Sequence, residues 1–133
     1  MADKTSYIMK AYVDWVESAG ARVVPLILED DLSVTDEKLK KLNGILFPGG
    51  AGNYRDLGDH IYQALVAEND NGNFYPLWGT CLGFENMAIW ASDGGRSFIL
   101  DDLESKDESL TLDFMGVDPT TLKMFENLGP AAY

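Results

Sequence analysis

The sequence contains a single cysteine and a single histidine among its 133 residues. One cysteine excludes an internal disulfide framework, and one cysteine with one histidine cannot complete a tetrahedral zinc site. No apolar run approaches the ~20 residues of a membrane-spanning helix. The N-terminus also lacks the apolar core of a signal peptide. The sequence therefore predicts a soluble chain without membrane contact, metal or cofactor.

Basic residues are scarce as well, with 10 Lys and Arg against 22 Asp and Glu and a net charge of −12. Residues 1–67 carry a net charge of −3, whereas residues 68–133 carry −9. A nucleic-acid interface needs clustered basic side chains, so this balance argues against that class of partner. The acidic run Asp101–Glu108 is predicted to be a solvated loop.

Hydrophobic residues make up 46% of the chain, which is enough for a packed core. Apolar spacing of 3.6 residues predicts four helices, at Tyr7–Ser18, Thr35–Leu42, Leu57–Glu68 and Phe84–Trp90. Ser6 and Thr35 are the expected caps of the first two, and Gly20 is expected to end the first in a left-handed conformation. Short apolar runs predict strands between the helices, at Val23–Leu28, Gly44–Phe47 and Tyr75–Trp78, with weaker ones at Ser97–Leu100 and Ser109–Leu112.

Strands that alternate with helices predict an α/β fold. We expect a doubly wound, mostly parallel, flavodoxin-like sheet that has helices on both faces and is incomplete at both ends, in one partial domain over residues 1–133. Ligands in such sheets bind beyond the carboxyl ends of the strands. Two loops fall at such ends, Pro48–Asn53 and Gly79–Gly83.

The segment Gly79–Gly83 has the sequence Gly-Thr-Cys-Leu-Gly and lies between a predicted strand and a predicted helix. A nucleophile on such a sharp turn projects from the top of the sheet, and glycines let the turn pack tightly. The following helix directs its N-terminal N–H groups at the sulfur, which favours the thiolate. Cys81 is therefore a candidate nucleophile. The alternative is a small, buried, inert cysteine.

The glycine-rich loop that follows Phe47 suits an oxyanion site. Acyl transfer needs N–H donors beside the nucleophile, and the Leu82 N–H is one candidate. Gly49 or Gly50 is the second candidate, because a glycine N–H can approach closely. The alternative for this loop is a plain turn. No phosphate-binding glycine motif is present.

Three blocks of the sequence resemble γ-glutamyl hydrolases in order and spacing: Ser18–Pro25, Asn43–Gly50 and Phe74–Glu85. A weaker match from Leu112 to Asn127 extends the resemblance over nearly the whole chain. That family cleaves γ-glutamyl bonds of folate polyglutamates and belongs to the class I glutamine-amidotransferase-like superfamily. The resemblance implies a cysteine (omega) peptidase of lysosomal, vacuolar or secreted location, and it is compatible with a homodimer.

The resemblance also implies roles for individual residues. Cys81 is the nucleophile, Leu82 and the Pro48–Gly50 loop form the oxyanion site, and Glu85 lies close to the bound glutamyl group. The alternative for Glu85 is a solvated acid in the first helical turn. Arg55, just after the glycine-rich loop, is the candidate partner of a substrate carboxylate, unless it is only a solvent-exposed loop residue.

The chain also departs from the family. The family has a strand before the first helix, and its base is a late histidine followed two residues later by a glutamate; neither is found here. His60 is predicted to be a surface histidine. The sequence is therefore expected to be a truncated copy, whether a fragment, an incomplete gene prediction or a degenerate copy, with impaired hydrolysis. The alternatives are a catalytically silent α/β module that binds a ligand or partner, and a glutamine amidotransferase domain.

Overall fold

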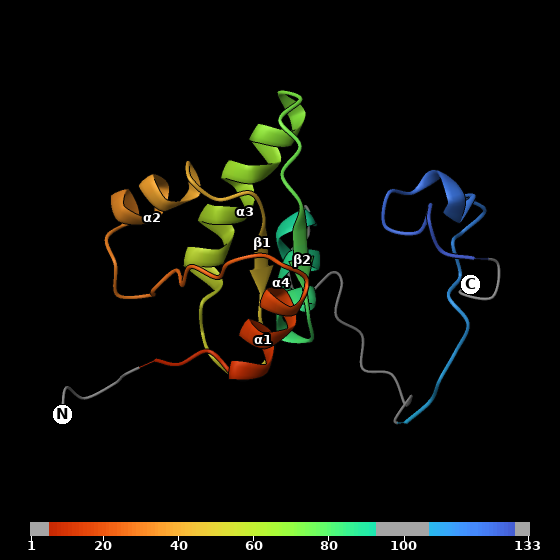
Figure 1. The fold of residues 1–133 in the computed structure, drawn as a ribbon, viewed down its shortest axis with the longest axis horizontal. Coiled ribbons are helices and arrows are strands. Elements are labelled where there is room, and N and C mark those ends of the chain that lie inside the picture. The colour runs from red at the N-terminus through yellow and green to blue at the C-terminus, as the bar shows by residue number, and fades with distance from the viewer. Residues whose placement is uncertain (1–5, 93–106, 130–133) are drawn as a thin grey trace. The chain divides into compact units, whose positions relative to one another are not determined.

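The computed structural model describes residues 6–92 and 107–129 (Figure 1). The chain divides into two compact units, one within residues 1–100 and the other within residues 101–133. The first unit is a mixed α/β structure that holds both candidate loops. Within the described ranges, no helix combines the length and the hydropathy that are needed to cross a membrane.

Over its described residues, 6–92, the first unit contains four helices and two strands. In chain order they are α1 (Lys10–Ser18), α2 (Leu32–Leu39), β1 (Ile45–Phe47), α3 (Arg55–Asp70), β2 (Leu77–Gly79) and α4 (Leu82–Ala91). The four predicted helices are all present, with shifted ends. Gly20 has a φ of 86°, which confirms its left-handed conformation after α1.

Two of the expected helix caps are wrong. Helix α1 starts at Lys10 with Met9 as its N-cap, and the Ser6 hydroxyl hydrogen-bonds Glu29 at 3.4 Å. Helix α2 starts at Leu32 after Asp31. Thr35 is therefore inside that helix, where its side chain is fully buried.

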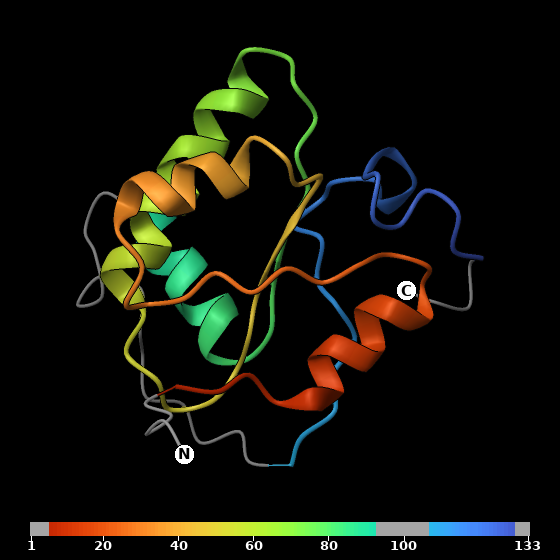
Figure 2. The same ribbon diagram turned by 60° about the vertical axis from the view of Figure 1, so that its left-hand side comes forward.

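The sheet consists of β1 and β2, which are parallel with Leu46 opposite Trp78. Helices α3 and α4 lie on one side of the strands and α1 on the other, as Figure 2 shows. Parallel strands joined through a helix agree with the predicted α/β class. The larger doubly wound, flavodoxin-like sheet is not confirmed, because the described sheet has only two strands.

The core lies between the strands, α2 and α3. Its buried members are Leu39, Phe47, Ile61 and Leu65. The Trp90 ring of α4 packs edge-on against Phe47, with ring centroids 5.0 Å apart. Helix α3 approaches Trp90 at Gly58, where an added Cβ would lie 2.3 Å from the indole. The absence of a side chain at Gly58 thus lets α3 and α4 pack together.

Two predicted strands are wrong. Val23–Leu28 is irregular, although Leu26 still packs against the core. Its apolar run is only partly covered, since Val24 and Leu28 are exposed, and Pro25 has no N–H to donate to a β-ladder. Ser109–Leu112 forms no strand either, and Ser97–Leu100 lies outside the described residues.

The second unit is described over residues 107–129 and contains one 3-10 helix, η1 (Pro119–Thr121). Asp118 caps it by accepting hydrogen bonds from the N–H and the hydroxyl of Thr120 at 2.9 and 2.7 Å. These bonds lower the pKa of Asp118. Phe114 and Phe125 pack edge to face, with centroids 5.1 Å apart. In the acidic run, Asp107 and Glu108 are exposed and residues 101–106 are outside the described part.

Candidate functional site

Cys81 lies on the turn between β2 and α4, as the N-cap residue of the helix. Its side chain is exposed, and its backbone has a φ of 52° and a ψ of −116°. A non-glycine residue at positive φ is strained, by about 1–3 kcal/mol, and such strain is typical of functional turns. The geometry is that of a strand–turn–helix nucleophile position.

The glycines on either side of Cys81 bring the turn against the sheet. A Cβ added at Gly83 would lie 2.0 Å from the carbonyl oxygen of Phe47, and one at Gly79 would lie 2.7 Å from the N atom of Phe84. The Thr80 N–H also donates to the Phe47 carbonyl at 3.1 Å. Cys81 is thus held directly beyond the carboxyl ends of both strands.

The glycine-rich loop runs beside this turn. An added Cβ at Gly49 would lie 2.9 Å from the Cβ of Cys81 and 3.2 Å from the carbonyl oxygen of Thr80. The structure therefore brings together the two segments that the sequence analysis selected. Gly50 has a φ of 128°, and no atom within 4 Å would meet a Cβ there.

Tyr12 of α1 occupies the space next to Gly49. Its hydroxyl oxygen accepts a hydrogen bond from the Gly49 N–H at 2.9 Å. Of the two candidate donors in the loop, Gly50 is the one whose N–H has no partner in the described part of the chain. Sequence reasoning missed Tyr12, because its spacing marked only the apolar face of a helix.

Tyr54 holds the other side of the same loop. Its hydroxyl donates to the Pro48 carbonyl oxygen at 2.6 Å, and its ring is parallel to that of Phe47 at a centroid separation of 6.5 Å. Burial raises the pKa of Tyr54, so its hydroxyl remains a protonated donor at neutral pH. No local sequence signal pointed to this residue.

The other predicted site residues lie on α4 and α3. Leu82 is the first residue of α4, and its N–H has no acceptor among the described residues. Glu85 is exposed in the first turn of α4, close to the positive end of the helix dipole. Arg55 begins α3 and is half-buried; its Nε is buried without a hydrogen-bond partner in the described part.

His60 lies away from this group. Its Nε2 is 2.7 Å from an Asp36 carboxylate oxygen on α2, and its side chain is 35% exposed. This pair ties α3 to α2. No described contact joins His60 to Cys81.

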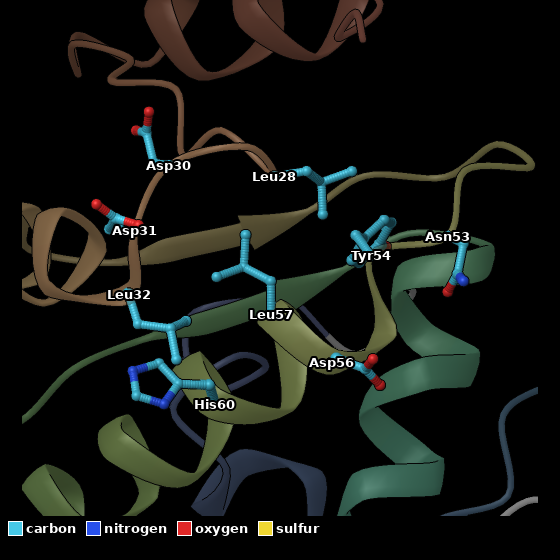
Figure 3. A pocket seen from close by; sticks show the side chains of 9 residues that line it. All are labelled: Leu28, Asp30, Asp31, Leu32, Asn53, Tyr54, Asp56, Leu57 and His60. Carbon is cyan, nitrogen blue, oxygen red and sulfur yellow. The ribbon is translucent and has the colours of Figure 1, made fainter. Parts of the chain in front are cut away.

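A hollow of about 480 Å³ opens near the start of α3 (Figure 3). Leucines form part of its lining, and the remaining side chains include three aspartates: Leu28, Asp30, Asp31, Leu32, Asn53, Tyr54, Asp56, Leu57 and His60. Lys38 is paired with Asp30 at 2.7 Å. Asp31 and Asp56 keep the lining acidic, which repels an anionic ligand. The hollow does not include Cys81.

The arrangement around Cys81 suits acyl transfer. An exposed thiol lies at the start of a helix, beside a loop whose Gly50 N–H has no described partner and is a candidate donor to a developing oxyanion. Among the described residues, no three His, Cys, Asp or Glu side chains come together as metal ligands would.

Comparisons with known proteins agree with this reading. The family profile described as Peptidase C26 matches residues 1–98. A human protein named gamma-glutamyl hydrolase is 38% identical over 128 residues, which cover 91% of this chain and 38% of that protein. Gamma-glutamyl hydrolase B of Dictyostelium discoideum is 36% identical over 84% of this chain and 33% of its own length. Gamma-glutamyl hydrolase 1 of Arabidopsis thaliana is 35% identical over 84% of this chain and 32% of its own length.

These matches confirm the resemblance that the three sequence blocks suggested. The chain spans less than two fifths of the length of each of these relatives. No solved structure gives a significant match.

Proposed function

The chain belongs to the Peptidase C26 family, and we propose that it carries the nucleophile and oxyanion part of a γ-glutamyl hydrolase that cleaves folate polyglutamates. One observation supports this most: Gly49 lies against Cys81 at the strained start of α4. Residues 1–133 would then be part of a single class I glutamine-amidotransferase-like domain, in a protein of the lysosome, the vacuole or the extracellular space.

The proposed chemistry is acyl transfer to sulfur. The Cys81 sulfur attacks the γ-carbonyl carbon, and the carbonyl oxygen becomes an oxyanion that faces the Leu82 and Gly50 N–H groups. When the C–N bond breaks, the amine leaves with the proton that the thiol lost. That amine is glutamate or a shorter polyglutamate; water then hydrolyses the thioester to release the shortened folate as its γ-carboxylate and to regenerate the thiol.

Recognition of the glutamyl group is assigned to two residues. Glu85, in the first turn of α4, is proposed to lie close to the bound glutamyl group and to accept a hydrogen bond from the N–H of its α-amide. Arg55 is proposed to pair with an α-carboxylate, since a guanidinium suits a bidentate carboxylate contact. A local cation is needed because a chain of net charge −12 repels a polyglutamate at long range.

Acylation of Cys81 tests this function. The chain is incubated with γ-glutamyl p-nitroanilide, nitroaniline release is recorded, and the intact mass is measured for a glutamyl adduct. We expect an adduct on Cys81 that α-glutamyl p-nitroanilide does not form. The Cys81→Ser variant is the matched control and should form no thioester. A native chain that forms neither adduct nor product would overturn the proposal.

A second candidate, a catalytically silent module that binds γ-glutamyl ligands, is favoured by one contact. The Gly49 N–H is already bonded to Tyr12, and no described residue contacts Cys81 as a base. Saturable binding of γ-glutamyl-glutamate by calorimetry, without acylation, would favour this candidate. Acylation would exclude it.

A further inference from the structure

A single peptide group, between Pro48 and Gly49, is held at both ends by tyrosine hydroxyls. Tyr54 donates to its carbonyl oxygen at 2.6 Å, and its N–H donates to Tyr12 at 2.9 Å. Because a peptide group is planar, fixing the direction of the C=O also fixes the direction of the N–H. The orientation of this peptide therefore depends on two side chains from different helix ends.

The loop itself has little intrinsic rigidity. Three of the five residues between Pro48 and Tyr54 are glycines, which have the greatest backbone freedom. The bond from Tyr54 to Pro48 closes the loop into a ring. The Tyr54 ring is in turn fixed, since it lies parallel to the buried Phe47 ring and 3.3 Å from the Cβ position of Gly58.

We infer that Tyr54 is a positioning residue, whose hydroxyl sets the Pro48–Gly49 peptide and with it the direction of the loop N–H groups beside Cys81. The inference concerns the loop, and its link to acyl transfer rests on the proposed function. Tyr54 has no described hydrogen bond to the thiol or to the Leu82 N–H. It acts on the oxyanion site through the peptide it holds.

The first test measures the loop without any substrate. Tyr54→Phe removes the hydroxyl and keeps the ring on Phe47. We expect amide hydrogen exchange at Gly49 to become about 5- to 10-fold faster, the effect of losing one ordinary hydrogen bond. Exchange at Leu65 in the core is the internal reference. Equal acceleration at both amides, or none at Gly49, would overturn the inference.

Tyr75→Phe is the matched control variant. Tyr75 also donates its hydroxyl to a backbone carbonyl, that of Leu39 at 3.2 Å, but it has no described hydrogen bond to the Pro48–Asn53 loop. Its replacement should leave exchange at Gly49 unchanged. An equal effect of Tyr75→Phe on Gly49 would show that any lost tyrosine bond loosens the loop, and would overturn the role of Tyr54.

The second test separates positioning from general damage. Iodoacetamide alkylates a thiol without forming an oxyanion, whereas acylation by γ-glutamyl p-nitroanilide needs one. Tyr54→Phe should slow acylation about 10-fold and leave the alkylation rate within twofold. Equal loss of both rates would overturn the inference. If the native chain is not acylated, the proposed function fails, and the exchange measurement still decides the role of Tyr54.

Discussion

Gly83 of α4 lies against the backbone of Phe47 at the end of β1. A Cβ on Gly83 would be 2.0 Å from the Phe47 carbonyl oxygen and 2.6 Å from its carbonyl carbon. Both atoms belong to the main chain, so no side-chain rotation can relieve the clash. The helix that carries Cys81 can approach the sheet only because this position has no side chain.

Gly83→Ala should therefore destabilise the fold strongly. Overpacking typically lowers stability by ~1–3 kcal/mol, and a clash with backbone is expected near the upper end, at about 3 kcal/mol. Gly52→Ala is the control, because nothing lies within 4 Å of that Cβ position; its effect should stay within about 0.5 kcal/mol. Urea unfolding followed by tryptophan fluorescence gives both values. Equal midpoints for the two variants would contradict the close approach.

The strain at Cys81 predicts an unusual order of stabilities. Glycine normally lowers stability relative to alanine, by ~0.4–1 kcal/mol, because its unfolded chain is more flexible. At a φ of 52° the order should reverse, with Cys81→Gly more stable than Cys81→Ala by about 1 kcal/mol. Ala51→Gly, at a loop position without positive φ, should show the normal loss. Thermal melts of the three variants test this, and a Cys81→Ala variant as stable as Cys81→Gly would refute the strained turn.

Stability should fall in alkaline solution because of two tyrosines. Burial raises the pKa of Tyr54 and of Tyr75 above the value of about 10 expected in the unfolded chain. Below pH ~10 neither state ionises, and above it the unfolded state loses protons first. The free energy of unfolding should therefore decrease as pH rises past ~10. In the double variant Tyr54→Phe/Tyr75→Phe, the free energy of unfolding should decrease less above this pH. Tyr7→Phe changes a residue that is 89% exposed, and its free energy of unfolding should decrease as much as that of the native chain. Urea titrations from pH 9 to 11 would show it.

Arg55 provides a prediction about binding. If its guanidinium pairs with a substrate carboxylate, Arg55→Ala should weaken affinity for γ-glutamyl-glutamate about 10-fold, typical of a charge-assisted contact of ~1.5 kcal/mol. The acylation rate at saturating substrate should change little. Arg55→Lys keeps the positive charge but loses the bidentate geometry, so its affinity should lie between those of the native chain and of Arg55→Ala. Calorimetry and saturation kinetics measure these effects, and an unchanged affinity in Arg55→Ala would remove Arg55 from the site.

Local sequence signals predicted the Cys81 turn well. An apolar run, a Gly-x-Cys-x-Gly sequence and a helical spacing lie within about twenty residues, and the structure forms a strand, a turn and a helix from them. The approach of Gly49 to this turn also followed, because the carboxyl ends of parallel strands share one edge of a sheet.

Other features depended on contacts that a local pattern does not contain. Tyr12 accepts a hydrogen bond from Gly49, which lies 37 residues further along the sequence. Ser6 hydrogen-bonds Glu29 and caps no helix. The apolar run at Val23–Leu28 indicated neither full burial nor a hydrogen-bonded ladder correctly, because Val24 and Leu28 are exposed and a strand also needs a partner.

The indole rings of Trp15 on α1 and Trp78 on β2 lie 5.3 Å apart at 45°. Two chromophores so close and so inclined couple their electronic transitions, which splits their circular dichroism band into a couplet of opposite signs. Trp78 is anchored at Thr80, next to the nucleophile, by a 3.0 Å bond from its Nε1 to the threonine hydroxyl. The couplet thus reports, without any label, whether α1 packs against β2 beside the Cys81 turn, and with it whether the Tyr12 hydroxyl is in place.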